Sequence, residues 1–222
     1  MKRLVLIHTV SWYNKSVIQP FSDPWQKENP DVEIINIMDD SLLSESLANG
    51  GPTKEVTRRM INYFMAAEIM GADVTMCTCT TMGHCTRVAR EIIKIPIFNI
   101  DEPMANEAVN TGKVIGILAT VPTSAPATKT QLEIEAGAQH KNIVIKTVIN
   151  EEAFKYLLRG EMEIHNELIY AELENLQKEV DVIVLGQISL GQIKYSTSVP
   201  VMQVGHSGFN HARKLLNLTD DN

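Results

Sequence analysis

Short runs of apolar residues, many of them β-branched, recur along the chain and predict buried β-strands. Most runs are continuous rather than alternating, which is typical of parallel strands that are covered on both faces. The runs lie at Leu4–His8, Val32–Ile37, Val74–Cys77, Ile95–Asn99, Val114–Leu118, Ile143–Val148, Val182–Leu185 and Val199–Val204.

Longer amphipathic stretches separate these runs and predict helices. They cover Thr53–Met70, Met82–Lys94, Ala125–Ala138, Glu151–Val180 and Gly208–Leu218. The stretch Glu151–Val180 is long enough for more than one helix. Strands that alternate with helices predict an α/β fold with parallel strands.

The strand pattern of the first half recurs in the second half. The similar segments are RLVLIHTV (3–10) with KVIGILAT (113–120), DVEIINI (31–37) with KNIVIKTV (141–148), GADVTMCTCT (71–80) with EVDVIVLGQI (179–188), and KIPIFNI (94–100) with SVPVMQV (198–204). Their offsets are 110, 110, 108 and 104 residues (113 − 3, 141 − 31, 181 − 73 and 200 − 96). We therefore predict two pseudo-symmetric parallel-sheet α/β halves.

The repeat also predicts the domain boundaries. We expect a first lobe over residues 1–105, with a C-terminal helix at 207–222 that packs back on it, and a second lobe over residues 106–206. Ligands bind beyond the carboxyl ends of strands in such sheets, so we expect the active-site cleft between the lobes. One long doubly wound sheet is the alternative.

Composition narrows the class of protein. The 222 residues are 44% hydrophobic and 21% charged, as in ordinary globular proteins. The net charge of −7 argues against a partner that is a nucleic acid or a membrane surface. Three cysteines are too few for a disulfide framework, and the apolar start has no small-residue cleavage site. We expect a cytoplasmic protein.

Polar residues gather where the predicted strands end. Hydroxyls and backbone N–H groups at helix starts, with no cluster of Lys or Arg, suit a small carboxylate better than a polyphosphate. The candidate substrate-binding residues are Ser11, Asn14, Thr80, Thr81, Thr120, Thr123, Gln187, Ser189 and His206.

Cys79 is the candidate catalytic residue. It follows a strand and precedes a predicted helix, where the positive helix N-terminus lowers the pKa of a thiol. The hydroxyls and amides of Thr80 and Thr81 could hold a carboxylate beside it. Cys77 and Cys85 are expected to be packed in the core.

No metal or nucleotide cofactor is expected. Cys77, Cys79, His84 and Cys85 bring soft ligands together, but their spacing lacks the CxxC or HExxH pattern of zinc sites. The chain also has no GxGxxG after a strand, no GxxxxGK[ST] and no GxSxG.

Other polar residues near strand ends have two interpretations each. Asp39 and Asp40 are expected to start a helix. Asp101 and Glu102 could belong to the cleft or cap a helix. His206 could serve as an acid or base near neutral pH or be a loop histidine with a structural role.

Several segments resemble the Asp/Glu/hydantoin racemase superfamily over nearly the whole chain. They are HTV (8–10), ADVTMCTCTTMG (72–83), IDEPMANEAV (100–109), GILATVPTSAPAT (116–128) and VDVIVLGQISLG (180–191). The resemblance implies two pseudo-symmetric halves, no cofactor, and a cysteine from each half beside the substrate α-carbon. Cys79 matches the first catalytic cysteine, Thr80 and Thr81 match the carboxylate-binding turn, and Thr120 and Thr123 match the second-half threonine pair.

The position of the second catalytic cysteine is occupied by Gln187, which is neither acid nor base. Gln187 could instead donate a hydrogen bond to a carboxylate or enolate oxygen, and His206, Ser189 or a water could act on the other face of the substrate. The resemblance therefore implies a racemase or epimerase of amino acids or their derivatives, and a homo-oligomer. The alternatives are a single-cysteine decarboxylase similar to arylmalonate decarboxylase, another one-sided isomerase, and a non-catalytic carboxylate-binding protein.

Overall fold

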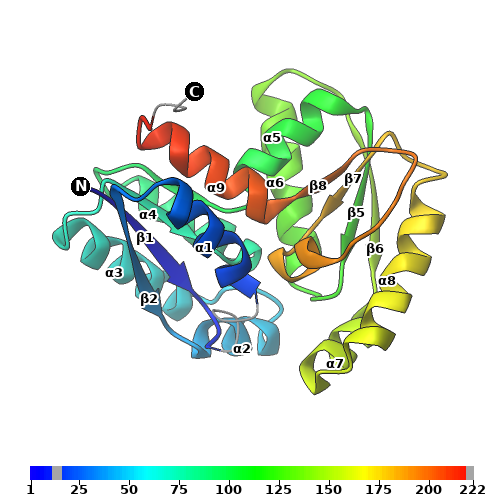
Figure 1. The fold of residues 1–222 in the computed structure, drawn as a ribbon, viewed down its shortest axis with the longest axis horizontal. Coiled ribbons are helices and arrows are strands. Elements are labelled where there is room, and N and C mark those ends of the chain that lie inside the picture. Colours follow the sequence, from blue (N-terminus) through cyan, green and yellow to red (C-terminus); the bar gives the residue numbers. More distant parts are fainter. Residues whose placement is uncertain (12–16, 219–222) are drawn as a thin grey trace. The chain divides into compact units, whose positions relative to one another are not determined.

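The computed structural model describes residues 1–11 and 17–218, and in these residues parallel strands form two separate sheets (Figure 1). The chain divides into unit 1, Met1–Ile100 with Gly205–Asn222, and unit 2, Asp101–Val204. Each unit contains one four-stranded sheet. The α/β prediction is confirmed, and the alternative of one continuous sheet is wrong.

The sheet of unit 1 has the strand order β2-β1-β3-β4, and that of unit 2 has the order β6-β5-β7-β8. The two inner strands of each sheet are almost entirely buried, which explains their continuous apolar runs. All the predicted strands are confirmed, with small shifts at their ends. The bounds are β1 Lys2–His8, β2 Val32–Met38, β3 Val74–Cys77, β4 Ile97–Asn99, β5 Val114–Ala119, β6 Val144–Ile149, β7 Val182–Leu185 and β8 Val201–Gln203.

The pairing register confirms the internal repeat. Lys2 lies opposite Val32, and Val114 lies opposite Val144, which is a separation of 30 residues in both sheets (32 − 2 and 144 − 114). All neighbouring strands are parallel in both units. The two halves therefore share one topology as well as one sequence pattern.

The predicted helices are present with modest changes at their ends. A left-handed Gly160 (φ 76°) divides the stretch Glu151–Val180 into two helices. The confirmed helices are α3 Lys54–Ile69, α4 Gly83–Arg90, α6 Ser124–Ala138, α7 Glu151–Arg159, α8 Met162–Leu176 and α9 Val204–Leu215.

Helix α2 Ser41–Ala48 is the helix expected to start at Asp39 and Asp40, and α5 Glu102–Thr111 follows Asp101, for which a helix cap was one of two interpretations. Helix α1 Gln19–Glu28 was not predicted from the sequence. Helix α1 contains Pro24 inside a ten-residue segment of low mean hydropathy, so its pattern is weak. Tertiary packing stabilises it, because the Trp25 ring lies 5.7 Å from the Phe209 ring on α9. Figure 1 shows α1 running beside α9 within unit 1.

Glycine allows α9 to approach the sheet of unit 1 closely. A Cβ atom on Gly208 would lie 2.6 Å from Cγ1 of Ile100 and 3.2 Å from Sδ of Met76. Real Cβ atoms do not come that near another carbon, so a side chain here would force the helix or Ile100 to move.

Gly208→Ala is expected to lower the free energy of unfolding. Overpacking costs about 1–3 kcal/mol, which exceeds the helix-propensity gain of about 0.5–1 kcal/mol. Gly137 on α6 is the matched control, because its Cβ would meet nothing within 4 Å. Gly137→Ala should therefore stabilise the protein. Urea denaturation measures both changes, and a Gly208→Ala variant at least as stable as the wild type would contradict this packing.

Candidate functional site

Cys79 lies at the carboxyl end of an inner strand of unit 1. Strand β3 ends at Cys77, and after Thr78 the residue Cys79 precedes a short 3₁₀ helix, Thr80–Met82, that leads into α4. The Cys79 carbonyl accepts a hydrogen bond from the Met82 N–H (3.0 Å). Cys79 has extended backbone angles and is 8% exposed. The helical turn after Cys79 was predicted, but it is a 3₁₀ turn before it becomes α-helix.

The threonines beside Cys79 are buried. Thr78 is 1% exposed, and Thr80 and Thr81, the predicted carboxylate-binding pair, are each 4% exposed in the first residues of the 3₁₀ helix. Burial of hydroxyls next to a thiol provides hydrogen-bonding groups in a place from which most water is excluded. This part of unit 1 therefore has the components of a small polar reaction site.

A buried histidine supports this turn, and the sequence analysis gave it no role of its own. His8 is the last residue of β1, and its Nδ1 lies 2.9 Å from Oγ1 of Thr78 while its Nε2 lies 2.7 Å from Oδ1 of Asn36. Burial lowers the pKa of His8, and the Asn36 hydrogen bond opposes this in part. Because the Asn36 Oδ1 atom can only accept, the His8 Nε2–H donates to it, and the Thr78 hydroxyl beside Nδ1 also lies 3.1 Å from the Ile7 carbonyl, to which it donates. The ring thereby orients the residue that precedes Cys79.

Unit 2 repeats this backbone geometry. The Thr78 N–H donates to the Ile7 carbonyl (3.0 Å), and the Gly186 N–H donates to the Leu118 carbonyl (2.8 Å). One residue further on, Gln187 precedes a 3₁₀ helix, Ile188–Gln192, and its carbonyl accepts from the Leu190 N–H (3.3 Å). Gln187 is thus the structural counterpart of Cys79.

The Gln187 carboxamide is fully hydrogen-bonded inside unit 2. Its Oε1 accepts from the backbone N–H groups of Thr120 and Val121, both at 2.9 Å. Its Nε2 donates to Oγ1 of Thr120 (2.8 Å) and to Oγ of Ser189 (2.7 Å). An amide has two hydrogens to donate, and both have acceptors here. A hydrogen bond from Gln187 to a substrate would therefore require one of these bonds to break.

The remaining predicted site residues have different environments. Ser11 is exposed in a bend after β1, and Asn14 lies outside the described residues. Thr123 is buried at the residue before α6. His206 is exposed on the first turn of α9 rather than in a loop, with its ring 5.1 Å from the Phe21 ring. Within the units, the structure brings Thr120, Gln187 and Ser189 together and places Thr80 and Thr81 directly after Cys79.

The candidate carboxylates have structural positions. Asp39 accepts hydrogen bonds from the Ser41 N–H (3.0 Å) and the Tyr63 hydroxyl (2.8 Å). Burial raises its pKa, but these hydrogen bonds and Arg59 outweigh burial and lower it. Asp40 and Asp101 are the residues that precede α2 and α5. The expectation that Asp39 and Asp40 start a helix is confirmed, and Asp101 takes the position of a helix cap.

The other cysteines are buried thiols. Cys85 on α4 lies 3.4 Å from Oγ1 of Thr57, and burial raises the pKa of its thiol. In the described ranges, no group of three or more His, Cys, Asp or Glu side chains is arranged to hold a metal ion. Over the same ranges, no helix is both long and apolar enough to cross a bilayer.

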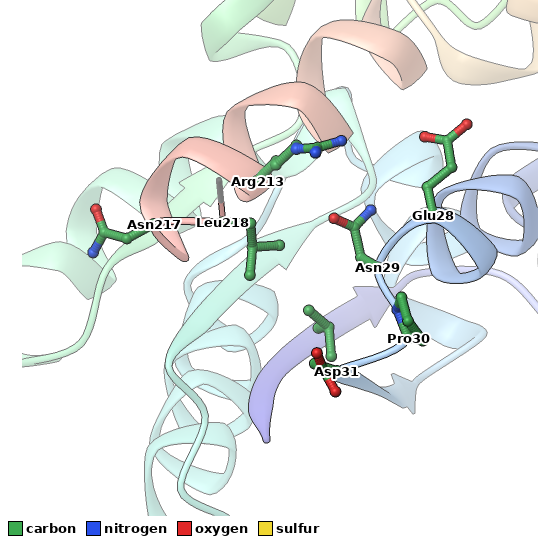
Figure 2. A pocket seen from close by; sticks show the side chains of 8 residues that line it. Glu28, Asn29, Pro30, Asp31, Arg213, Asn217 and Leu218 are labelled. Atoms are coloured by element: carbon green, nitrogen blue, oxygen red, sulfur yellow. The ribbon is translucent and has the colours of Figure 1, made fainter. Parts of the chain in front are cut away.

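Unit 1 also contains a pocket of about 450 Å³, at the end of the sheet opposite to Cys79. Val32, at the start of β2, lines this pocket and pairs with Lys2, at the start of β1. Figure 2 shows Arg213 on α9 across from Asn29 and Glu28 at the end of α1. Cys79 lies at the carboxyl ends of the strands, where ligands of parallel sheets usually bind, whereas this pocket lies at their amino ends. The pocket is therefore separate from the Cys79 turn.

Comparisons with known proteins agree with the fold. Residues 25–195 match the model of the Asp/Glu/hydantoin racemase family. No curated protein matches the sequence of the chain. Similar solved structures include aspartate racemase from Picrophilus torridus (17% identity, 98% of this chain and 95% of that chain covered, TM-score 0.71), allantoin racemase from Klebsiella pneumoniae (17%, 98% and 89%, 0.67) and a glutamate racemase isoform from Bacillus anthracis (14%, 97% and 82%, 0.71). At these identities the similarity shows the fold.

The buried His8 predicts a pH dependence of stability. The pKa of His8 is lower in the folded protein than its ordinary value of 6.5. When the pH falls below 6.5, His8 therefore takes up a proton in the unfolded chain but not in the folded one. The free energy of unfolding should therefore decrease between pH 7.5 and pH 5.5, and His8→Gln should make this dependence weaker. Urea denaturation at both pH values tests this. His84→Gln is the control, because His84 is exposed. If the free energy of unfolding depends on pH equally in the wild type and in His8→Gln, the lowered pKa of His8 is refuted.

Proposed function

Because the chain belongs to the Asp/Glu/hydantoin racemase family, we propose that it moves the proton on the carbon alpha to a carboxylate, with Cys79 as acid or base. The family and the fold support a racemase-type function. The observation that carries the proposal is the position of Cys79, a slightly exposed thiol at the carboxyl end of strand β3 with buried hydroxyls on both sides. The structures of similar fold include aspartate, glutamate and allantoin racemases, so the proposed substrates are amino acids or their derivatives.

In the proposed reaction, Thr80 and Thr81 bind the substrate carboxylate with their hydroxyl and backbone N–H groups. The Cys79 thiolate accepts the α-proton, and the electron pair of the C–H bond moves into an enolate-like intermediate. The thiol then returns the proton, or a group on the other face supplies one. Fixed donors and exclusion of water stabilise the intermediate, so the proposal requires no cofactor.

His8 has a positioning role in this proposal. Its Nδ1 contacts Oγ1 of Thr78, the neighbour of Cys79, at 2.9 Å, and His8 is completely buried. A neutral, buried ring cannot exchange protons readily with solvent, so we assign it to orientation of the turn and not to proton transfer. Thr123, Ser189 and His206 stay candidate substrate contacts. Ser11 and Asn14, which follow β1 in the sequence, are candidate substrate contacts as well.

A second candidate function is a one-sided reaction, either decarboxylation or an isomerisation in which a single thiol protonates one face. Gln187 favours it, because the residue equivalent to Cys79 is an amide whose oxygen and both hydrogens are already hydrogen-bonded. An amide with these bonds offers neither a base nor an acid for a second proton transfer. A cytoplasmic location and a homo-oligomeric state stay predictions from the sequence.

Cys79→Ala is expected to reduce turnover by about 10²–10⁴-fold, which is the usual contribution of a positioned acid or base. The assay incubates the protein in D₂O with the enantiomers of aspartate and glutamate, 5-substituted hydantoins and substituted malonates. Proton NMR follows the α-proton, and chiral chromatography follows inversion. Inversion supports a racemase, and decarboxylated product supports a one-sided lyase.

Cys85→Ala is the matched control, because Cys85 is a buried thiol on the following helix with a raised pKa. It should retain turnover. Full turnover in Cys79→Ala would refute the assignment of Cys79. If no substrate loses its α-proton but ligands still raise the melting temperature, the protein binds carboxylates without catalysis.

A further inference from the structure

The Oε1 atom of Gln187 occupies a small nest in unit 2. Two successive backbone N–H groups, those of Thr120 and Val121, point at this one oxygen from 2.9 Å each. Successive N–H groups that converge on one point form a typical binding place for an anionic oxygen. The 15-residue helix α6 begins three residues after Val121, and its positive end favours negative charge here.

The rest of the nest is also suited to a carboxylate. The hydroxyls of Thr120 and Ser189 lie 2.8 and 2.7 Å from Nε2 of Gln187. A hydroxyl can rotate and donate where it now accepts. If a carboxylate took the place of the carboxamide, it would therefore meet two N–H donors and two O–H donors. Four donors around one position can satisfy the oxygens of a carboxylate.

We propose that Gln187 is an internal ligand: its side chain fills a latent carboxylate-binding nest in unit 2 and keeps small external carboxylates out of it. The inference depends on the proposed function in one respect: it implies that the substrate carboxylate binds at the Cys79 turn and not in unit 2. Gln187 is thus a specificity-determining residue that acts by exclusion. The Gln187 residue is itself only 4% exposed.

Gln187→Ala tests this directly, because it removes the carboxamide and keeps the nest. Its melting temperature should fall by roughly 5–10 °C, since two N–H groups and two hydroxyls lose their partners. Sodium acetate and acetamide, at up to about 100 mM, should each raise it again in a saturable way. Sodium chloride at equal ionic strength controls for a general salt effect.

Gln131→Ala is the matched control. Gln131 is also 4% exposed in unit 2, and its Nε2 donates to the side chain of Glu135 (3.1 Å). Acetate and acetamide should leave the melting temperatures of Gln131→Ala and of the wild type unchanged. Equal shifts in all three proteins, or no shift in Gln187→Ala, would overturn the proposal.

A second pair of variants applies if Gln187→Ala does not fold. Gln187→Glu and Gln187→Met have side chains of similar length, but only Glu presents an anionic oxygen to the nest. At pH 7.5, Gln187→Glu should melt close to the wild type and well above Gln187→Met. A side chain that only filled space would give the opposite order. These readouts do not use activity, so their failure leaves the Cys79 proposal intact, and failure of that proposal leaves the nest intact.

Discussion

The pairing of the two inner strands in each sheet is the constraint on which the rest of this structure depends. Strand β1 pairs with β3, and β5 pairs with β7, in the same parallel arrangement. In each sheet the last ladder bond comes from the residue after the strand, Thr78 or Gly186. The next residue then has to leave the sheet at its carboxyl end. This shared backbone geometry places Cys79 in unit 1 and Gln187 in unit 2 at equivalent positions, one residue beyond the last hydrogen bond between the inner strands.

Equivalent backbones therefore support very different chemistry. A thiol in this position can exchange a proton, whereas the Gln187 carboxamide bonds to Thr120, Val121 and Ser189 and closes its own turn. The difference lies in side-chain length and polarity, because Gln reaches the neighbouring loop with both of its polar atoms. A duplicated fold has in this way become chemically asymmetric. The proposed second candidate function, a one-sided reaction at a single thiol, is consistent with this asymmetry.

Much of the fold could be predicted from the sequence, because the inner strands are covered on both faces and leave continuous apolar runs. The repeat was visible for the same reason. Helix α1 was missed because its prolines are unfavourable in helices, so its sequence does not predict one. The contact between Trp25 and Phe209, which are far apart in the sequence, stabilises it in the folded protein. The catalytic candidate Cys79 could be selected from its local position alone.

The partners of the polar side chains could not be read from local sequence. Gln187 and Thr120 are 67 residues apart, and His8 and Thr78 are 70 apart, so only the folded register brings each pair together. The prediction that Gln187 binds substrate came from the sequence alone, and the hydrogen bonds of its carboxamide within unit 2 are visible only in the structure. A polar residue at the end of an apolar run, as at His8, was the one available signal for the buried histidine.

Hydrogen exchange of individual backbone amides tests this asymmetry most directly. In the wild type, NMR should show that the amides of Thr120 and Val121 exchange far more slowly than amides of exposed loops, because Gln187 accepts from both. Gln187→Ala should remove this protection while amides in β5 and β7 keep theirs. If Thr120 and Val121 exchange at loop rates in the wild type, the turn is not closed, and the account of one reactive and one sealed half is wrong.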